Sequence, residues 1–142
     1  GAVGPLGAVI NRHAAHDRVW VGSFSTARIR AFRRAMGPRV ATAASQVDVG
    51  VLAWAVGARR LWPLAGQALQ VPERDPRTGW PVVSRGLVRA AHRLGAQVHV
   101  WTINDRPAME RLIDLGVDGL VSDDIATLKE VLVGRGLWEG EP

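Results

Sequence analysis

Five short apolar runs alternate with helix-like stretches along this chain, and the alternation constrains its fold more than any other feature. The runs lie at residues 18–24, 39–42, 68–71, 97–103 and 117–122. They are mostly apolar, which predicts strands buried on both faces. Strands that alternate with helices through short links are typical of parallel α/β architecture. Because strand–helix–strand crossovers are almost always right-handed and parallel, we expect five parallel strands in one curved sheet with the helices outside.

The stretches between these runs carry the start and stop signals of helices. Ser25 and Ser84 are placed as N-caps, and the last two helices have two candidates each: Asn104 or Asp105, and Asp123 or Asp124. Pro107 falls in a first turn, where proline is tolerated, and glycines follow several helices. The helices are predicted at residues 3–15, 26–36, 45–62 and 85–94, from residue 104 or 105 to Gly116, and from residue 123 or 124 to Val133.

The number of strands limits the choice of fold. No glycine-rich dinucleotide or P-loop fingerprint follows any of the runs, which argues against a nucleotide-binding doubly wound sheet. A TIM barrel remains, but such barrels usually have eight strands and about 250 residues. This chain has 142 residues and five runs. We therefore expect residues 1–142 to be a single incomplete domain, the C-terminal portion of a TIM (β/α)8 barrel.

The chain is basic, with a formal charge of +5 and a pI of about 11.3, and arginine supplies 17 of its 18 cationic side chains. The densest run, Arg28, Arg30, Arg33 and Arg34, falls in a predicted helix and is interpreted as a solvated outer face. It lacks the interleaved aromatic residues that stack on bases. We expect no nucleic-acid partner; an arginine-rich nucleic-acid binder stays open as a third hypothesis and would bind DNA with strong salt dependence.

The sequence contains no predicted membrane-spanning segment and no recognisable targeting signal. Its longest apolar stretch, residues 49–58, is far shorter than the roughly 20 residues that a membrane span needs. No signal-peptide pattern is visible at the start, although the chain opens with Gly1 and not with Met. The absence of cysteine excludes disulfides and leaves the compartment open, with the cytoplasm slightly favoured.

Three sequence blocks resemble the C-terminal part of glycerophosphodiester phosphodiesterases. They are RVWVGSFSTARIRAFRRAMGPRVAT at 18–42, LQVP followed by VVSRGLVRAAHRLGAQVHVWT, and VHVWTIND followed by a helix and GVDGLVSDD at 116–124. The resemblance extends over residues 18–133. The pair W-T-[IV]-N and G-V-D-G-[IL]-[IV]-[ST]-D at this separation is fairly specific, whereas either motif alone is a weak signal.

This resemblance implies a TIM-barrel phosphoric diester hydrolase of glycerophospholipid metabolism. Such an enzyme hydrolyses a small-molecule glycerophosphodiester to glycerol 3-phosphate and an alcohol, with a divalent cation (calcium or magnesium) held by carboxylates and a histidine pair as acid and base. The family's signatures, namely an H-R pair, an E-x-D pair, a later His and an E-x-K strand, precede the strand that corresponds to Ser23 and Phe24. None stands in its proper place here. We therefore expect no catalytic residue and no metal ligand in this chain, and no activity from the chain alone.

Some local residues imitate these signatures. Glu73-Arg74-Asp75 spells E-x-D, but it lies in a turn rich in proline and glycine and is interpreted as a solvated loop. His13 and His16 are three residues apart, whereas a zinc-binding helix pair is normally four apart with a Glu between. They are interpreted as polar residues at the frayed end of the first helix. His92 is expected at the outer edge of its helix.

The predicted substrate-binding residues are Trp101, Phe24 and Ser23. His99 and Trp101 share one face of their strand by period-two geometry. If Trp101 faces inward, it walls the mouth of the barrel, where barrel enzymes bind their substrates; an ordinary core tryptophan is the alternative. The resemblance implies a place beside the glycerol moiety. Asp123 is interpreted as a helix cap, because the family's T-D-x-P pattern is altered here by Ser122 and Ile125.

A second hypothesis belongs to a different functional class. The chain would then be a non-catalytic barrel remnant that acts as an interaction module. A half barrel has open strand edges and exposed apolar surface, and both favour pairing with another chain. Self-association through these edges is therefore possible under either hypothesis. The leaving alcohol, the metal and the oligomeric state are left open by the sequence.

Overall fold

The computed structural model describes residues 1–54 and 63–140 of the chain. Strands and helices alternate in the expected order, and the part of the predicted helix 45–62 beyond Trp54 lies outside the described residues. The helices are α1 (Val3–Arg12), α2 (Thr26–Met36), the 3-10 helix η1 (Gly37–Arg39), α3 (Gln46–Trp54), α4 (Arg85–Arg93), α5 (Arg106–Leu115) and α6 (Ile125–Gly134). The strands are β1 (Trp20–Val21), β2 (Ala41–Thr42), β3 (Ala68–Pro72), β4 (Gln97–Trp101) and β5 (Gly119–Leu120).

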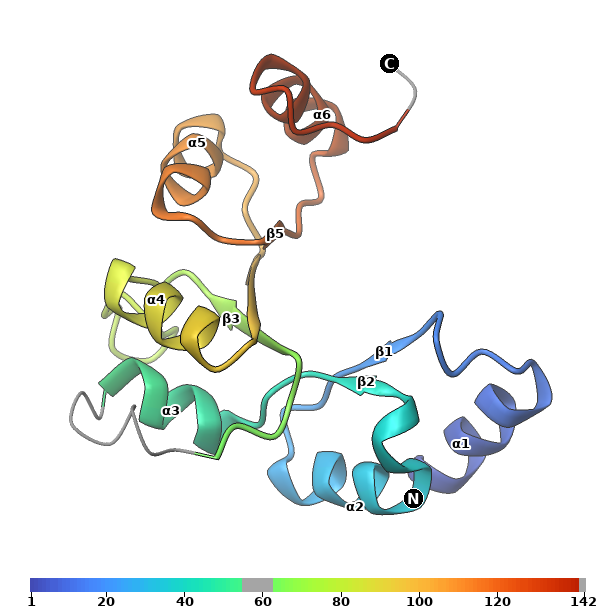
Figure 1. Ribbon diagram of the computed structural model, residues 1–142. Coiled ribbons are helices and arrows are strands. Elements are labelled where there is room, and N and C mark those ends of the chain that lie inside the picture. The colour runs from blue at the N-terminus through green and yellow to red at the C-terminus, as the bar shows by residue number, and fades with distance from the viewer. Residues whose placement is uncertain (55–62, 141–142) are drawn as a thin grey trace.

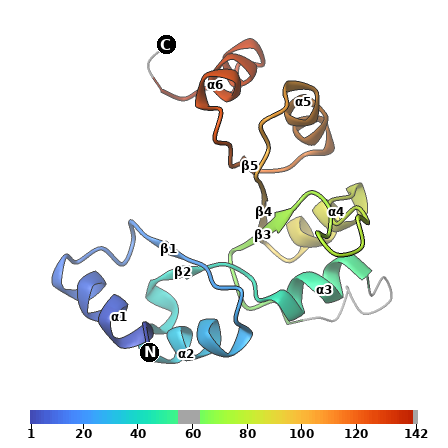
Figure 2. The ribbon, with the colours of Figure 1, turned by 180° about the vertical axis from the view of Figure 1, so that it is seen from behind.

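All five strands are parallel and lie in sequence order. The pairs are β1 with β2, β3 with β4, and β4 with β5. A parallel bridge between Ala43 and Ala68 connects β2 to β3, and the Ala44 amide donates to the Ala68 carbonyl at 2.6 Å. The helices lie along an arc on the outer side of these strands, from α1 and α2 to α6 (Figures 1 and 2). The prediction of one parallel sheet that forms part of a barrel is confirmed.

Every predicted strand is present, but three of them are short. The strands β1, β2 and β5 contain two residues each, whereas the apolar runs that predicted them span 18–24, 39–42 and 117–122. Within the described chain, β1 and β5 each have a strand neighbour on one side.

The main core lies between the central strands and the outer helices. Leu69, Val71, Val98 and Val100 are at most 1% exposed and pack in one cluster with residues of α4 and α5. The alternate residues of β3 and β4 point to the opposite, inner face, where Gln70 and Gln97 are exposed. The expectation of strands buried on both faces is therefore wrong for this chain. The interior of a closed barrel is filled by side chains from all its strands, and five strands leave that face partly open.

A smaller core lies under the first two helices. Ile10, Phe32 and Val40 are at most 3% exposed and pack with Val21 and Met36. Ile29 on α2 is 1% exposed. The buried face of α2 thus packs against α1 and β1.

The arginine-rich face of α2 is solvated except at one position. Arg28, Arg30 and Arg34 are exposed as predicted. Arg33 instead turns toward the sheet, where it donates to the Thr42 hydroxyl at 2.9 Å and to the Ala43 carbonyl at 2.7 Å. Burial lowers the pKa of Arg33 from its usual value, and the Asp48 carboxylate opposes this effect. The expectation that these arginines bind no nucleic acid stays a prediction.

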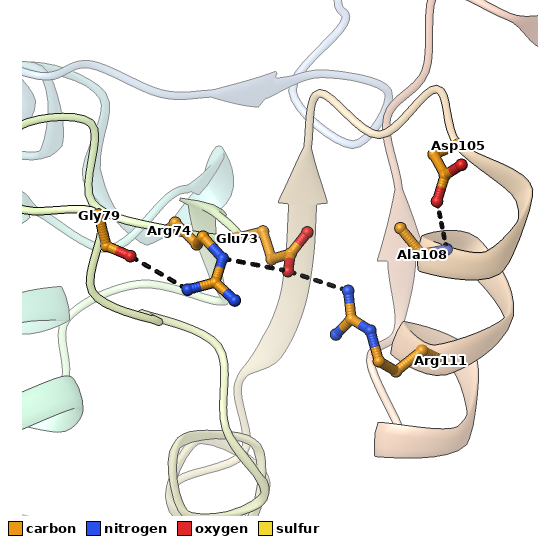
Figure 3. Close-up of polar contacts among 6 residues, drawn as sticks. All are labelled: Glu73, Arg74, Gly79, Asp105, Ala108 and Arg111. Carbon is orange, nitrogen blue, oxygen red and sulfur yellow. Dashed lines mark hydrogen bonds and ion pairs between the residues drawn. The ribbon is translucent and has the colours of Figure 1, made fainter.

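Capping residues define most helix ends where they were expected. The hydroxyls of Ser25 and Ser84 accept hydrogen bonds from Arg28 N and Leu87 N, at 3.3 and 3.2 Å. Of the two candidates before α5, Asp105 is the cap, and its carboxylate accepts from Ala108 N at 2.9 Å (Figure 3). Among the described residues, no helix is long and apolar enough to cross a membrane.

Candidate functional site

A cavity of ≈ 650 Å³ opens at the carboxyl ends of the strands. It is lined by the segment after β1 (Gly22, Ser23, Phe24), by α3, by β3 with the loop that follows it, and by Trp101 at the end of β4. The loops at this end of a parallel barrel form the active sites of TIM-barrel enzymes. The cavity is therefore the candidate functional site of this chain.

Trp101 and Phe24 form an aromatic wall of this cavity. Their ring centroids are 5.8 Å apart at an interplanar angle of 71°, an edge-on contact. Trp101 is half-buried and shares the inner face of β4 with Gln97 and His99, whereas Phe24 is 71% exposed. Trp101 thus lies beside Phe24 at the mouth of the strands, the position expected from its place at a strand end. Its role in binding substrate stays a prediction.

The chain after β1 is shaped to bring Ser23 and Phe24 to the cavity. A Cβ atom at Gly22 would lie 2.9 Å from Oε1 of Gln70, so the flexible Gln70 side chain would have to move slightly to admit one. The Ser23 hydroxyl oxygen accepts a hydrogen bond from Ser25 N at 3.2 Å, which orients the start of α2. A hydroxyl group has one donor and two acceptor positions, so Ser23 still has an O–H group to offer toward the cavity.

The polar clusters after β4 and β5 are joined through Asn104. Its Oδ1 accepts hydrogen bonds from Asp123 N at 2.9 Å and from the Ser122 hydroxyl at 3.1 Å, and its Nδ2 donates to Asp123 Oδ2 at 3.4 Å. The interpretation of Asp123 as a helix cap is therefore wrong, because its carboxylate contacts the neighbouring loop. Sequence reasoning weighed Asn104 only as a cap and missed this link between the two loops.

Asp124 is the residue that caps α6. Its carboxylate accepts from Thr127 N at 3.0 Å and from the Thr127 hydroxyl at 2.7 Å. The same two hydrogen bonds lower the pKa of Asp124 from its usual value. Both oxygen atoms of this carboxylate therefore accept hydrogen bonds at the start of α6.

The carboxylates of the E-x-D sequence at Glu73-Arg74-Asp75 make contacts within their loop and to α5. The Glu73 carboxylate pairs with Arg111 of α5 at 2.9 Å and lies 3.9 Å from Arg74 Nε (Figure 3). Asp75 Oδ1 accepts from the backbone amides of Thr78 and Arg77, both at 2.9 Å, and these bonds lower the pKa of Asp75. The two carboxylates thus act on different partners, as the loop interpretation expects.

The four histidines lie in other parts of the described chain. His13 follows α1, and His16 Nε2 lies 2.8 Å from Asn11 Oδ1. His92 of α4 pairs with Asp118 at 2.8 Å. His99 lies on the inner face of β4, with its ring centroid 5.3 Å from that of Trp20; partial burial lowers its pKa, and Asp118 opposes the shift. No histidine is among the described residues that line the cavity.

The side chains present do not fit the divalent cation that the family resemblance implies. Calcium and magnesium need several clustered oxygen ligands. Within residues 1–54 and 63–140, no group of three or more His, Cys, Asp or Glu side chains could hold a metal ion. These residues therefore do not form a metal site by themselves.

Comparisons with known proteins agree on one family. The model of the glycerophosphoryl diester phosphodiesterase family matches residues 4–127. A curated relative, probable glycerophosphodiester phosphodiesterase 2 of Mycobacterium tuberculosis, is 38% identical over 146 residues, which cover 98% of this chain and 54% of the relative. A glycerophosphodiester phosphodiesterase of Arabidopsis thaliana is 39% identical over 44 residues, covering 31% of this chain and 13% of the relative.

A solved structure has the same fold. The putative glycerophosphoryl diester phosphodiesterase from Silicibacter pomeroyi DSS-3 superposes with a TM-score of 0.72 at 25% identity, and the match covers 95% of this chain and 44% of that chain. This chain thus spans about half the length of the Mycobacterium tuberculosis relative and less than half of the solved structure.

Proposed function

This chain belongs to the glycerophosphoryl diester phosphodiesterase family, and from that membership we propose that the whole protein hydrolyses glycerophosphodiesters to glycerol 3-phosphate and an alcohol. The observation that carries the proposal is the combination of the family match with a cavity at the carboxyl ends of five parallel barrel strands. Residues 1–142 are proposed to be one incomplete domain of that protein, with the family resemblance strongest over 18–133. The pathway proposed for this reaction is glycerophospholipid metabolism.

The part of the site that we assign to this chain is a substrate-binding wall. The apolar faces of Trp101 and Phe24 can pack on the carbon atoms of the glycerol moiety, since aromatic rings bury a large area in a defined geometry. The Ser23 hydroxyl can donate to an oxygen atom of the substrate. All three line one cavity, which is what supports their common role.

We assign the catalytic chemistry to residues outside this sequence. Hydrolysis of a phosphodiester needs stabilisation of the phosphate charge and a general acid that protonates the leaving alkoxide. In this family a calcium or magnesium ion and a histidine pair are implied for these tasks. Two observations support this assignment: the described residues contain no group of three or more His, Cys, Asp or Glu side chains that could hold a metal ion, and no histidine is among the described residues that line the cavity.

The proposal is tested with a longer protein, which we call the extended protein. It contains this sequence and, in addition, the part of the barrel that is present in the matched relatives but has no counterpart in this sequence. We expect it to release glycerol 3-phosphate from glycerophosphocholine in the presence of calcium or magnesium. A chelator should abolish the release, and added metal should restore it. A properly folded extended protein that is inactive on every glycerophosphodiester tried would refute the assignment.

A mutation at Trp101 tests the wall. In the extended protein, we expect Trp101→Ala to raise the KM for glycerophosphocholine roughly tenfold with a smaller effect on kcat, because an apolar contact in a pocket contributes about 1–3 kcal/mol to binding. Trp101→Phe preserves a ring in contact with Phe24 and should recover most of the loss. The measurement is steady-state kinetics on variants with matched circular dichroism. A fall in kcat without a change in KM would contradict the binding role.

The non-catalytic alternative is favoured by the open edges. Within the described chain, β1 and β5 each have a strand neighbour on one side, and Trp20 on the inner face is 37% exposed. Under this hypothesis the chain self-associates through these edges. Light scattering after size-exclusion chromatography of the 142-residue chain and of the extended protein decides it. Association that persists once the barrel is complete would favour the interaction module, and association confined to the short chain would not.

A further inference from the structure

Two tryptophans that are far apart in the sequence are in contact, and one of them, Trp54, lines the cavity. Trp54 at the end of α3 and Trp80 in the loop between β3 and α4 have ring centroids 5.8 Å apart at an interplanar angle of 56°. They are 49% and 63% exposed. Exposed aromatic side chains that gather in one place mark binding sites more often than scattered apolar residues do. Neither ring belongs to the wall assigned above to the glycerol moiety.

The tryptophan pair and the glycerol wall share one cavity. Trp54 lines it together with the pair Phe24–Trp101, and the lining also includes Val49, Val71 and Val82. We call the part lined by Val49, Trp54 and Val82, together with Trp80 in contact with Trp54, the apolar lobe. The cavity therefore continues beyond the wall assigned to the glycerol moiety, over side chains that are mostly apolar at this part.

The chemistry of the apolar lobe fits a neutral apolar group better than a cationic one. An aromatic cage holds a quaternary ammonium between separate ring faces, each about 6 Å or less from the charge. Here the two rings of each pair are in contact, with centroids 5.8 Å apart, so one ring face in each pair is partly covered by the neighbouring ring. The cavity lining also has one cationic and one anionic residue, Arg77 and Asp75, so these two residues together add no net charge. The aliphatic side chains of the lobe add no polar atoms.

We propose that the apolar lobe binds an alkyl or aryl leaving alcohol of the substrate. The inference rests on the proposed function. A phosphodiester has one organic group on each side of the phosphorus, so a glycerol moiety against Trp101 and Phe24 directs the other group to a different part of the cavity. The apolar lobe is the continuation that the described residues provide. The protein then prefers glycerophosphodiesters with apolar alcohols over those with small alcohols.

The test compares two substrates of equal chemical reactivity in the extended protein. Glycerophospho-1-octanol and glycerophosphoethanol both have a primary alkoxide as leaving group and differ only in apolar length. We expect kcat/KM to favour the octyl substrate by roughly tenfold or more, since a few methylene contacts in an apolar pocket discriminate on that scale. Trp54→Ala and Trp80→Ala should each reduce this ratio severalfold. Trp138→Ala, a matched change at a tryptophan outside the cavity that packs near Lys129, should leave the ratio unchanged.

The outcomes separate this inference from the proposed function. Hydrolysis of both substrates with a ratio near one, or an equal loss for both substrates in the two variants, would overturn the inference and leave the function standing. So would a preference for an octanoyl group on the glycerol in place of octanol. If the folded extended protein hydrolyses neither substrate, the binding of the two diesters is measured by calorimetry. Tighter binding of the octyl diester, weakened by Trp54→Ala, would support the apolar lobe although the proposed function fails. Equal binding of the two diesters would refute both the lobe and the function.

Discussion

The 142-residue chain by itself is expected to release glycerol 3-phosphate from glycerophosphocholine no faster than the uncatalysed reaction, whereas the extended protein accelerates it by at least about 10⁶-fold. This difference in rate follows from the proposal that this chain supplies the substrate-binding wall and that the catalytic groups lie outside this sequence. The short chain has the wall of the site, with Trp101 and Phe24 in contact. The carboxylate in the described cavity lining, Asp75, accepts hydrogen bonds from the backbone amides of Thr78 and Arg77, which lower its pKa and so disfavour the protonated form that a general acid needs.

The reason lies in the other tasks of the carboxylates near the ends of the strands. The chain has 13 acidic residues. Of those that follow the last two strands, Asp105 and Asp124 cap helices, and Asp123 is held by Asn104. A divalent cation that is to neutralise the phosphate charge needs several oxygen ligands, mostly carboxylates, that converge on one point. Side chains spread over two caps and a loop link do not converge.

Both proteins are assayed side by side with calcium or magnesium, with and without a chelator. Circular dichroism first establishes that the short chain is folded. Trp101→Ala in the short chain is the control for contamination, because turnover by a trace hydrolase does not respond to this change. Chelator-sensitive turnover that Trp101→Ala reduces would show that the catalytic residues lie within this sequence, contrary to the assignment.

Leu69→Ala is expected to lower the free energy of unfolding by about 2–5 kcal/mol, the usual cost of a leucine deleted from a packed core. Leu69 lies on β3 with 0% of its surface exposed, and it belongs to the cluster that joins the strands to α4 and α5. The residue next to it on the strand, Gln70, points to the inner face and is exposed. A cavity left at Leu69 cannot be filled from solvent, because β-strand neighbours and helices surround it.

Urea unfolding of the extended protein measures this effect through the midpoint, with the slope m expected to stay unchanged. Leu137→Ala removes the same atoms from a side chain that is 51% exposed and should change stability by less than about 0.5 kcal/mol. Leu69→Met conserves volume and should cost less than about 1.5 kcal/mol. A cost for Leu69→Ala no larger than that for Leu137→Ala would contradict the burial of β3 under the helices.

Features that depend on a few neighbouring residues were predictable from the sequence alone. The order of strands and helices followed from the apolar runs, and Ser25, Ser84 and Gly116 marked helix ends where the structure has them. The position of Trp101 at the mouth followed from its place at a strand end and from the two-residue period of a strand. In each case the interacting atoms belong to residues that are close in the sequence, so the rules for helix caps and strand periodicity are sufficient.

Features that depend on distant partners required the tertiary structure. Asn104 does not cap α5 because Ser122 and Asp123 of the next loop occupy its side chain. Arg33 leaves the solvated face of its helix because the hydroxyl of Thr42 and the carbonyl of Ala43 lie within reach. The parallel packing of successive strand–helix units brings these partners close together. Sequence patterns predict the order of the units along the chain but not which side chains of neighbouring units come into contact.

The candidate site shows the same division. The sequence alone determined that Ser23, Phe24 and Trp101 follow or end strands, and that all three belong at one end of a parallel sheet. Only the tertiary structure decided that Trp54 lines the same cavity and that Trp80, 26 positions further along the chain, packs against it. The physical reason is that a strand end sets the direction of its own side chains, whereas a cavity is the space that several separate segments enclose together, and its shape exists only once they are packed.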